Sequence, residues 1–135
     1  MKTQLYQNNN LLIEQDTAFD GLLITWSGFT NDEEFRHCID HAMSYLISHK
    51  SQRLIHDMSA FQGISLVAQE YASMRSKEIT QQIGQIKRAL IVPKDVFAKF
   101  SMNNVNQQTV KEDGQVRRSF ANYTDACTWL NEPEV

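Results

Sequence analysis

At the centre of the chain stands Arg53-Leu-Ile-His-Asp-Met-Ser-Ala-Phe-Gln-Gly-Ile-Ser65, where an apolar strand runs into a polar turn and then into the start of a helix. Leu54 and Ile55 can be buried as strand residues. Asp57 and Ser59 bring polar side chains to the carboxyl end of the strand, the side of an open α/β sheet where ligands and partners usually bind. We therefore expect the functional surface at this junction.

Further strands are predicted on both sides of the junction. Residues 22–27 alternate with a period of two, which predicts a strand that pairs antiparallel with residues 11–14. Residues 87–92 end in the apolar run Ala-Leu-Ile-Val, which is closed by Pro93, and this predicts an interior parallel strand. Residues 116–120 predict a last, partly polar strand.

Two long helices are expected between these strands. Thr30 and Glu33 match a capping box, so we predict a first helix that starts there and runs to about His49. Ser65 has a good side chain for the N-cap of the second helix, and Gly84 stands where a left-handed residue would end it.

The remaining segments complete an α/β architecture. Residues 95–109 predict two short helical segments that end at the turn Glu112-Asp-Gly114, and residues 124–130 predict a short closing helix. Alternating strands and helices favour a mixed, mostly parallel sheet with an antiparallel N-terminal edge, packed by about four helices. We expect one domain over residues 1–135, with residues 1–10 as a loosely ordered edge segment.

Composition limits the kinds of partner that the protein could bind and the cellular compartment in which we expect it. The chain has 135 residues, 41% hydrophobic and 21% charged, and a formal net charge of −3, which does not favour a nucleic-acid binder. No apolar run approaches the ~20 residues that span a bilayer, and residues 1–10 lack the apolar core of a signal peptide. Cys38 and Cys127 are expected as small buried residues in a reducing compartment. We predict a cytoplasmic protein without integral membrane association.

Two groups of side chains resemble catalytic or metal sites without completing one. His37 and His41 have the i, i+4 spacing of two zinc ligands, but no third ligand accompanies them, and both are expected to face water. His56, Asp57 and the two serines are the residue types of a hydrolase triad. Neighbouring strand residues point to opposite faces, so His56 and Asp57 cannot easily share a hydrogen bond. We predict no metal site and no enzyme.

The glycines and the basic residues give no stronger indication of a binding site. The five glycines never cluster, so no phosphate loop or dinucleotide fingerprint is present and no cofactor is expected. Six basic residues gather around the last strands and predict a solvated face, with a modest anion site as the alternative; they are Lys87, Arg88, Lys94, Lys99, Arg117 and Arg118.

The end of the central strand also carries a family resemblance. The motif Leu54-Ile-His-Asp-Met-Ser59 precedes a turn and a helix, and Ile91-Val-Pro-Lys-Asp-Val-Phe-Ala-Lys-Phe-Ser101 ends the next strand. With this order of elements, the chain resembles the STAS-like (SpoIIAA-like) domains, the superfamily of bacterial anti-sigma-factor antagonists, and in particular its stand-alone branch. Asp57-Met-Ser59 is similar to the Asp-Leu-Ser of the family strand, and Trp129-Leu130 also fits. The resemblance covers residues 11–130 and implies a single STAS-like domain.

The resemblance implies a non-catalytic regulatory module that docks through the turn and helix after the central strand. The implied partner-binding residues are Asp57, Ser59, Phe61, Gly63 and Ser65. In switching members a serine at the start of that helix is phosphorylated by a partner kinase, which would here be an anti-sigma-type kinase. Ser65 is the closest match to that serine, although it is displaced by about one residue from the family position. Its alternative role is that of a helix N-cap. A homodimer is a further alternative.

A second function follows from the same fold shape. The shape is similar to lipid-carrier domains of the Sec14 kind, which implies a small apolar ligand beneath the second and third helices. The expected pocket residues are Tyr71, Met74, Phe97 and Phe100, although Phe97 and Phe100 fit the core better than a ligand pocket. An enzyme of uncharacterised activity is the third alternative.

Overall fold

The computed structural model describes residues 1–28, 31–61, 66–93, 110–112 and 114–133, with the backbone alone at 61, 66–69, 110 and 112. Along the chain, its elements are β1 (Lys2–Gln7), β2 (Leu11–Asp16), β3 (Gly21–Gly28), α1 (Asp32–His49), β4 (Arg53–Phe61), α2 (Leu66–Ile83), β5 (Ile86–Ile91), β6 (Val110–Glu112), β7 (Gln115–Phe120) and α4 (Tyr123–Leu130).

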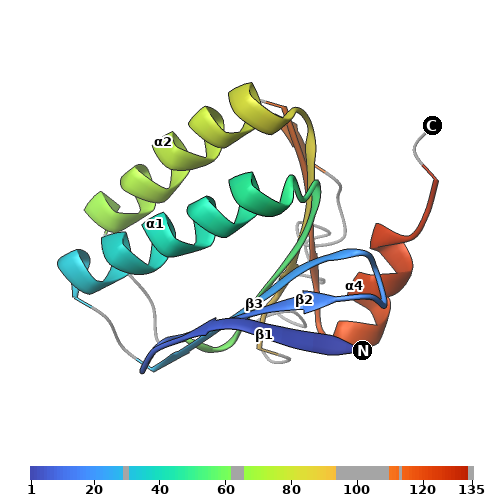
Figure 1. Ribbon diagram of the computed structural model, residues 1–135, viewed down its shortest axis with the longest axis horizontal. Coiled ribbons are helices and arrows are strands. Elements are labelled where there is room, and N and C mark those ends of the chain that lie inside the picture. Colours follow the sequence, from blue (N-terminus) through green and yellow to red (C-terminus); the bar gives the residue numbers. More distant parts are fainter. Residues whose placement is uncertain (29–30, 62–65, 94–109, 113, 134–135) are drawn as a thin grey trace.

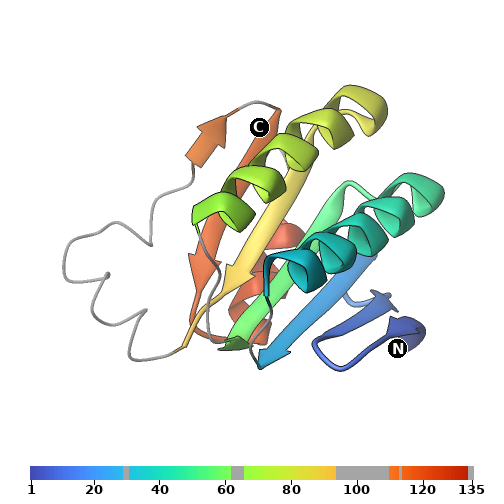
Figure 2. The same cartoon turned by 90° about the vertical axis from the view of Figure 1, so that its left-hand side faces the viewer.

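The strands form one mixed sheet in the order β1-β2-β3-β4-β5-β7-β6. The central strands β3, β4, β5 and β7 run parallel to one another, whereas β1, β2 and β6 add antiparallel pairings at the two sides. Helices α1 and α2 lie side by side on one face of the sheet, and α4 lies behind it on the other face (Figure 1, Figure 2). This arrangement confirms the predicted mostly parallel α/β fold with an antiparallel N-terminal edge.

Strand β3 is buried on both faces because helices cover both sides of the sheet. Leu22, Ile24 and Trp26 pack in the cluster beneath α1 and α2, whereas Leu23 packs in the cluster that contains residues of α4. At the first residue of β3, a Cβ on Gly21 would lie 2.2 Å from the backbone oxygen of Arg53. Only glycine therefore allows β3 and β4 to approach this closely.

Helix α1 starts one residue later than the capping box predicts. Its N-cap is Asn31, whose side-chain oxygen accepts a hydrogen bond from the backbone N–H of Glu34 at 2.8 Å. The predicted cap at Thr30 with Glu33 is therefore wrong, since Asn31 already satisfies an N–H of the first turn. The predicted end at His49 is confirmed, and one face of the helix buries Phe35, Cys38, Ile39, Ala42 and Leu46.

Helix α4 is attached to the sheet by two buried polar contacts. The ammonium group of Lys87 in β5 donates to the backbone oxygen of Trp129 and lies 4.5 Å from the centre of the indole ring. The hydroxyl of Tyr123 donates to the carboxylate of Asp16 in β2, and burial followed by this hydrogen bond raises the pKa of Tyr123. Both contacts lie at the ends of α4, so they fix its position against the sheet.

The largest difference from the prediction concerns β6. A helical segment was expected to extend up to the turn before residue 114, whereas residues 110–112 form a strand antiparallel to β7. Cross-strand hydrogen bonds with residues 115–117 set this conformation, and three residues are too few to show a period in the sequence. The short helices predicted over residues 95–109 fall outside the described residues.

Candidate functional site

The carboxyl end of β4 contains an irregularity in its pairing with β3. Thr25 pairs with Asp57 and Ser27 pairs with Ala60, so three steps along β4 oppose two steps along β3. Such a β-bulge bends the strand and changes the direction of its side chains. The Asp57 carboxylate accepts from the backbone N–H of Ser59 at 3.1 Å and from its hydroxyl at 2.6 Å. These hydrogen bonds stabilise the bulge, and they leave Ser59 and Ala60 exposed.

On the opposite face of β4, His56 is buried. The indole N–H of Trp26 donates to its Nδ1 at 3.0 Å. Burial, followed by the positive charge of Arg88, holds the pKa of His56 well below its usual value. The imidazole is therefore neutral near pH 7. His56 accepts a hydrogen bond from Trp26, whereas Asp57 accepts hydrogen bonds from Ser59. The predicted separation of His56 and Asp57 on opposite faces of the strand is therefore confirmed.

An apolar cavity of about 150 Å³ lies between the sheet and the two helices α1 and α2. Its buried floor comes from β3, β4 and α1, and its partly buried rim comes from β4, α2 and β5. The lining residues are Trp26, Phe35, Ile39, Met43, His56, Met58, Ala72, Ser76, Arg88 and Leu90. The cavity therefore reaches the carboxyl half of the parallel strands, where ligands of open α/β sheets usually bind.

Arg88 in β5 provides the charge of this cavity. One terminal nitrogen, Nη2, donates to the hydroxyl of Ser76 at 3.1 Å, and the buried Nε has no hydrogen-bond partner in the described part of the chain. Burial, followed by the nearby charge of Arg117 in the next strand, lowers the pKa of Arg88 to about 10. Arg88 is therefore still charged near pH 7. The predicted solvated face is wrong for Arg88 and for the buried Lys87.

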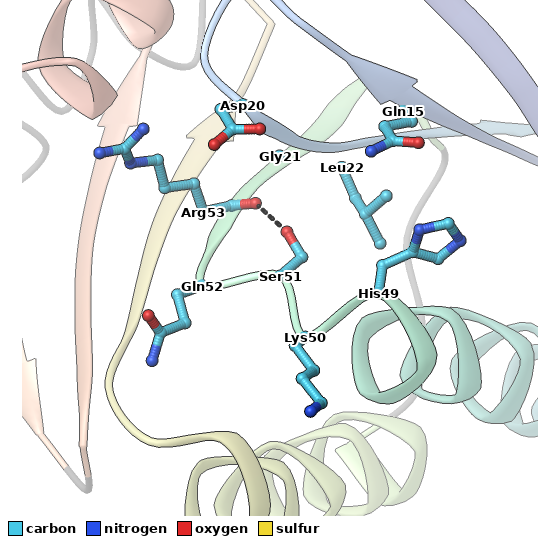
Figure 3. A pocket seen from close by; sticks show the side chains of 9 residues that line it. All are labelled: Gln15, Asp20, Gly21, Leu22, His49, Lys50, Ser51, Gln52 and Arg53. Atoms are coloured by element: carbon cyan, nitrogen blue, oxygen red, sulfur yellow. Dashed lines mark hydrogen bonds between the residues drawn. The ribbon is translucent and has the colours of Figure 1, made fainter.

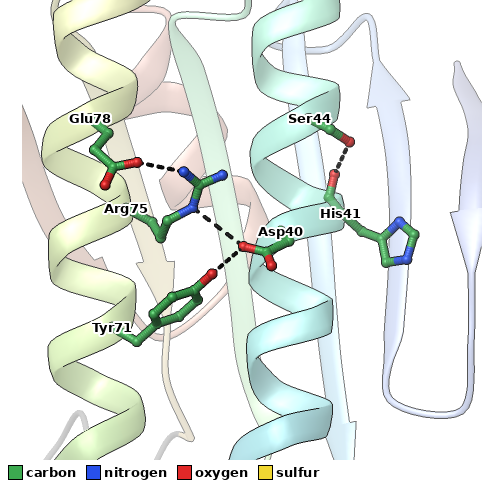
Figure 4. A network of polar contacts seen from close by, with 6 residues as sticks. All are labelled: Asp40, His41, Ser44, Tyr71, Arg75 and Glu78. Carbon is green, nitrogen blue, oxygen red and sulfur yellow. Dashed lines mark hydrogen bonds and ion pairs between the residues drawn. The ribbon is translucent and has the colours of Figure 1, made fainter.

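The two long helices are joined by a polar network on their outer surface (Figure 4). Asp40 of α1 accepts from the hydroxyl of Tyr71, and its carboxylate lies 3.3 Å from Nε of Arg75. Arg75 also pairs with Glu78 one turn further along α2. The hydrogen bond to Asp40 raises the pKa of Tyr71. These contacts hold α1 and α2 side by side, so that the outer sides of the two helices form one surface. Each exposed ion pair contributes little to stability.

A second hollow, of about 270 Å³, lies at the opposite end of the sheet, where β4 begins. His49 and Lys50 enter it from the end of α1, and the hydroxyl of Ser51 donates to the backbone oxygen of Arg53 at 2.9 Å (Figure 3). The lining is polar, and Gln15 and Asp20 close the other side. The carboxyl-terminal end of α1 carries a partial negative charge, which weakens the attraction of these basic residues for an anion.

Comparison with known proteins identifies the fold. The sequence matches no protein-family model and no curated protein. A solved structure does match: an uncharacterized protein of the DUF3478 family from Shewanella loihica PV-4, described as having a SpoIIAA-like fold. The two chains are 17% identical, the match covers 93% of this chain and 98% of the other, and the TM-score is 0.56. This chain has a SpoIIAA-like fold.

Two of the predicted docking residues are adjacent in this SpoIIAA-like structure. Asp57 and Ser59 share the bulge of β4, and the backbone of Phe61 pairs with Gly28 at the end of the same strand. Gly63 and Ser65 lie outside the described residues, so the predicted N-cap and phosphorylation roles of Ser65 stay predictions.

Two of the predicted pocket residues, Tyr71 and Met74, do not line this cavity. Tyr71 bonds to Asp40 and packs against the edge of the core between the helices, and Met74 is 49% exposed on α2. Phe97 and Phe100 are outside the described residues.

Trp26 and Arg88 line the cavity but are not predicted to do so from the sequence. One signal was available. Lys87 and Arg88 interrupt the apolar pattern of an interior strand that precedes a proline, and such interruptions often mark functional positions. His37 and His41 are exposed as predicted, and His41 stacks on Tyr6. In the described part of the chain, no three His, Cys, Asp or Glu side chains gather in a group that could hold a metal.

No helix in the described ranges is both long and apolar enough to cross a membrane. Cys38 is buried, Cys127 is partly buried, and both are free thiols. Burial is the main cause that raises the pKa of each thiol, so neither is activated as a nucleophile.

Proposed function

We propose that this protein is a non-catalytic regulatory module that binds a protein partner through the carboxyl end of β4 and the exposed side of α2. The observation that carries the proposal is the bulge of β4, where Asp57 holds the backbone and hydroxyl of Ser59. A fixed bulge presents its exposed residues in one conformation, which reduces the entropy lost on binding. The SpoIIAA-like fold supports a role like that of anti-sigma-factor antagonists.

The outer side of α2, the helix that follows β4 in the chain, is the second part of the proposed surface. Met74 is a large apolar residue with 49% exposure, and the small polar residue Ser73 beside it is also exposed. The contacts of Tyr71 and Arg75 with Asp40 hold α2 against α1, so that the surface does not have to be ordered when a partner binds. An apolar side chain surrounded by small and polar residues is a common arrangement at protein interfaces.

A surface substitution tests the proposal without disturbing the core. Ala60→Arg places a long charged side chain on the exposed bulge, and Ser73→Arg does the same on α2. Gln81→Arg, on the exposed last turn of α2, is the matched control. With tagged native protein in a lysate of the cells that express it, we expect wild type and Gln81→Arg to capture one protein at a constant molar ratio. Ala60→Arg and Ser73→Arg should both lose it.

Two outcomes contradict the proposal. One is capture that is equally strong with Ala60→Arg and Ser73→Arg, and the other is the absence of any stoichiometric partner. Size-exclusion chromatography identifies a second copy of the chain as the partner if wild type forms a dimer and Ala60→Arg does not.

The phosphorylation switch is tested separately. Phosphate on Ser65 would add about −1.5 to −2 charges close to the proposed surface in sequence. We expect Ser65→Asp to weaken capture and Ser65→Ala to retain it. Equal capture by both variants would exclude a charge switch at this residue.

A further inference from the structure

The cavity beneath α2 has the size of a small ring compound. It measures about 150 Å³. Engineered apolar cavities of about this volume bind benzene. Its floor is buried, whereas Met58, Ala72 and Leu90 on its rim are only partly buried. A small molecule would therefore lie against a buried apolar floor and would enter past the carboxyl half of β4 and β5.

The hydrogen bond from Trp26 determines which ring nitrogen of His56 carries the proton and can donate to a ligand. An indole N–H can only donate, so Nδ1 of His56 must accept and carries no proton. A neutral imidazole then has its proton on Nε2. Within the described residues, His56 makes its hydrogen bond through Nδ1. His56 is also one of the residues that line the cavity. His56 therefore offers a donor to the cavity.

Arg88 adds further donors and a positive charge. A guanidinium group has no acceptor, and its buried Nε–H finds no partner in the described part of the chain. A buried donor without a partner costs free energy, and more when it carries charge. Arg117 occupies the paired position in β7 and adds a second positive charge on the same face of the sheet. A ligand with a negative oxygen would relieve both costs.

From these contacts, we propose that the cavity binds a small carboxylic acid with a compact apolar body, whose carboxylate accepts hydrogen bonds from Nε of Arg88 and Nε2 of His56. The apolar residues Trp26, Phe35 and Leu90 would surround the body of the acid. A planar carboxylate suits a guanidinium group because both can form two parallel hydrogen bonds. This site lies on the inner side of α2 and is independent of the docking surface.

Benzoate is the probe, because its ring matches the cavity and its carboxylate matches the donors. Toluene tests the apolar walls without the anion, and inorganic phosphate tests the charge without the ring. Titration calorimetry and thermal unfolding of the full chain measure binding. We expect benzoate to bind and to stabilise the protein, toluene to bind at least tenfold more weakly, and phosphate not to compete.

Variants distinguish the donors from the general charge of the protein. Arg88→Gln should weaken benzoate at least tenfold, and His56→Phe should weaken it by a smaller factor. Arg118→Gln removes an arginine from the other face of β7 and should leave affinity unchanged. Arg88→Lys keeps the charge, so if Arg88→Gln fails to fold, Arg88→Lys should fold and bind benzoate more weakly than wild type.

Three results would overturn the inference. Toluene binding as tightly as benzoate would show that the cavity recognises the apolar ring and not the carboxylate. Phosphate competing equally would indicate a general anion site. Absence of benzoate binding, or unchanged affinity in the arginine variants that fold, would remove the proposed role of Arg88.

Discussion

Protonation of His56 should destabilise the fold, because the imidazole is buried and its Nδ1 accepts a hydrogen bond from Trp26. That bond occupies Nδ1, and burial holds the pKa of His56 well below its usual value in the folded state. In the unfolded chain the pKa returns to about 6.5. As the pH falls below about 6.5, the unfolded state binds the proton first, so stability is lost toward acid and is kept above this range.

The magnitude can be worked out for two convenient pH values. Between pH 7.5 and 5.5 the unfolded histidine becomes mostly protonated, whereas the lowered pKa of His56 reduces proton uptake by the folded state. This difference costs up to about 1.4 kcal/mol of the free energy of unfolding across the interval. Other titrating groups contribute to the measured change, so the quantity of interest is the difference between wild type and a variant that lacks the imidazole.

His56→Gln is that variant, because its amide oxygen can accept from Trp26 and its side chain does not titrate. Urea unfolding followed by far-ultraviolet circular dichroism avoids the fluorescence of Trp26 itself. We expect wild type to lose up to about 1.4 kcal/mol more than His56→Gln between pH 7.5 and 5.5. His37→Gln removes an exposed imidazole as a control. Equal losses in wild type and His56→Gln would refute the reasoning.

Substitutions at three further positions test contacts of the fold by urea unfolding at pH 7. Gly21→Ala places a Cβ 2.2 Å from the backbone oxygen of Arg53, so we expect a loss of about 3 kcal/mol; an unchanged midpoint would contradict this close approach. Tyr123→Phe removes a donor from the buried carboxylate of Asp16 and should cost about 2 kcal/mol, and a neutral effect would argue against the contact. Asn31→Ala should cost about 1 kcal/mol, whereas Asn31→Asp should cost little; equal losses would exclude Asn31 as the N-cap.

The sequence predicts the layers of this fold well because its strands have strong local patterns. The alternation of residues 22–27 and the apolar run at the end of residues 87–92 each indicate a strand without knowledge of its neighbours. Pairing then follows from the order of elements, since helical connections favour parallel neighbours. Strand β6 has only three residues, so its conformation depends on hydrogen bonds with β7 that no local pattern encodes.

The candidate site is harder to predict because its contacts join distant residues. The sequence places His56 and Asp57 on opposite faces of one strand, and the structure confirms it. The partner of His56 is Trp26, thirty residues away, and no spacing rule connects them. Arg88 was expected in water because arginine is mostly exposed in proteins. Its burial depends on α2 covering β5, which brings Ser76 to its guanidinium group.

The outermost strands of the sheet limit aggregation. Strand β1 has polar residues such as Lys2 and Gln4, and its register shifts between Gln4 and Tyr6. Strand β6, at the other side, is only three residues long. Charged, irregular or short outer strands are poor templates for the strands of another molecule. These features reduce the tendency of the two outer strands of the seven-stranded sheet to pair with strands of another molecule.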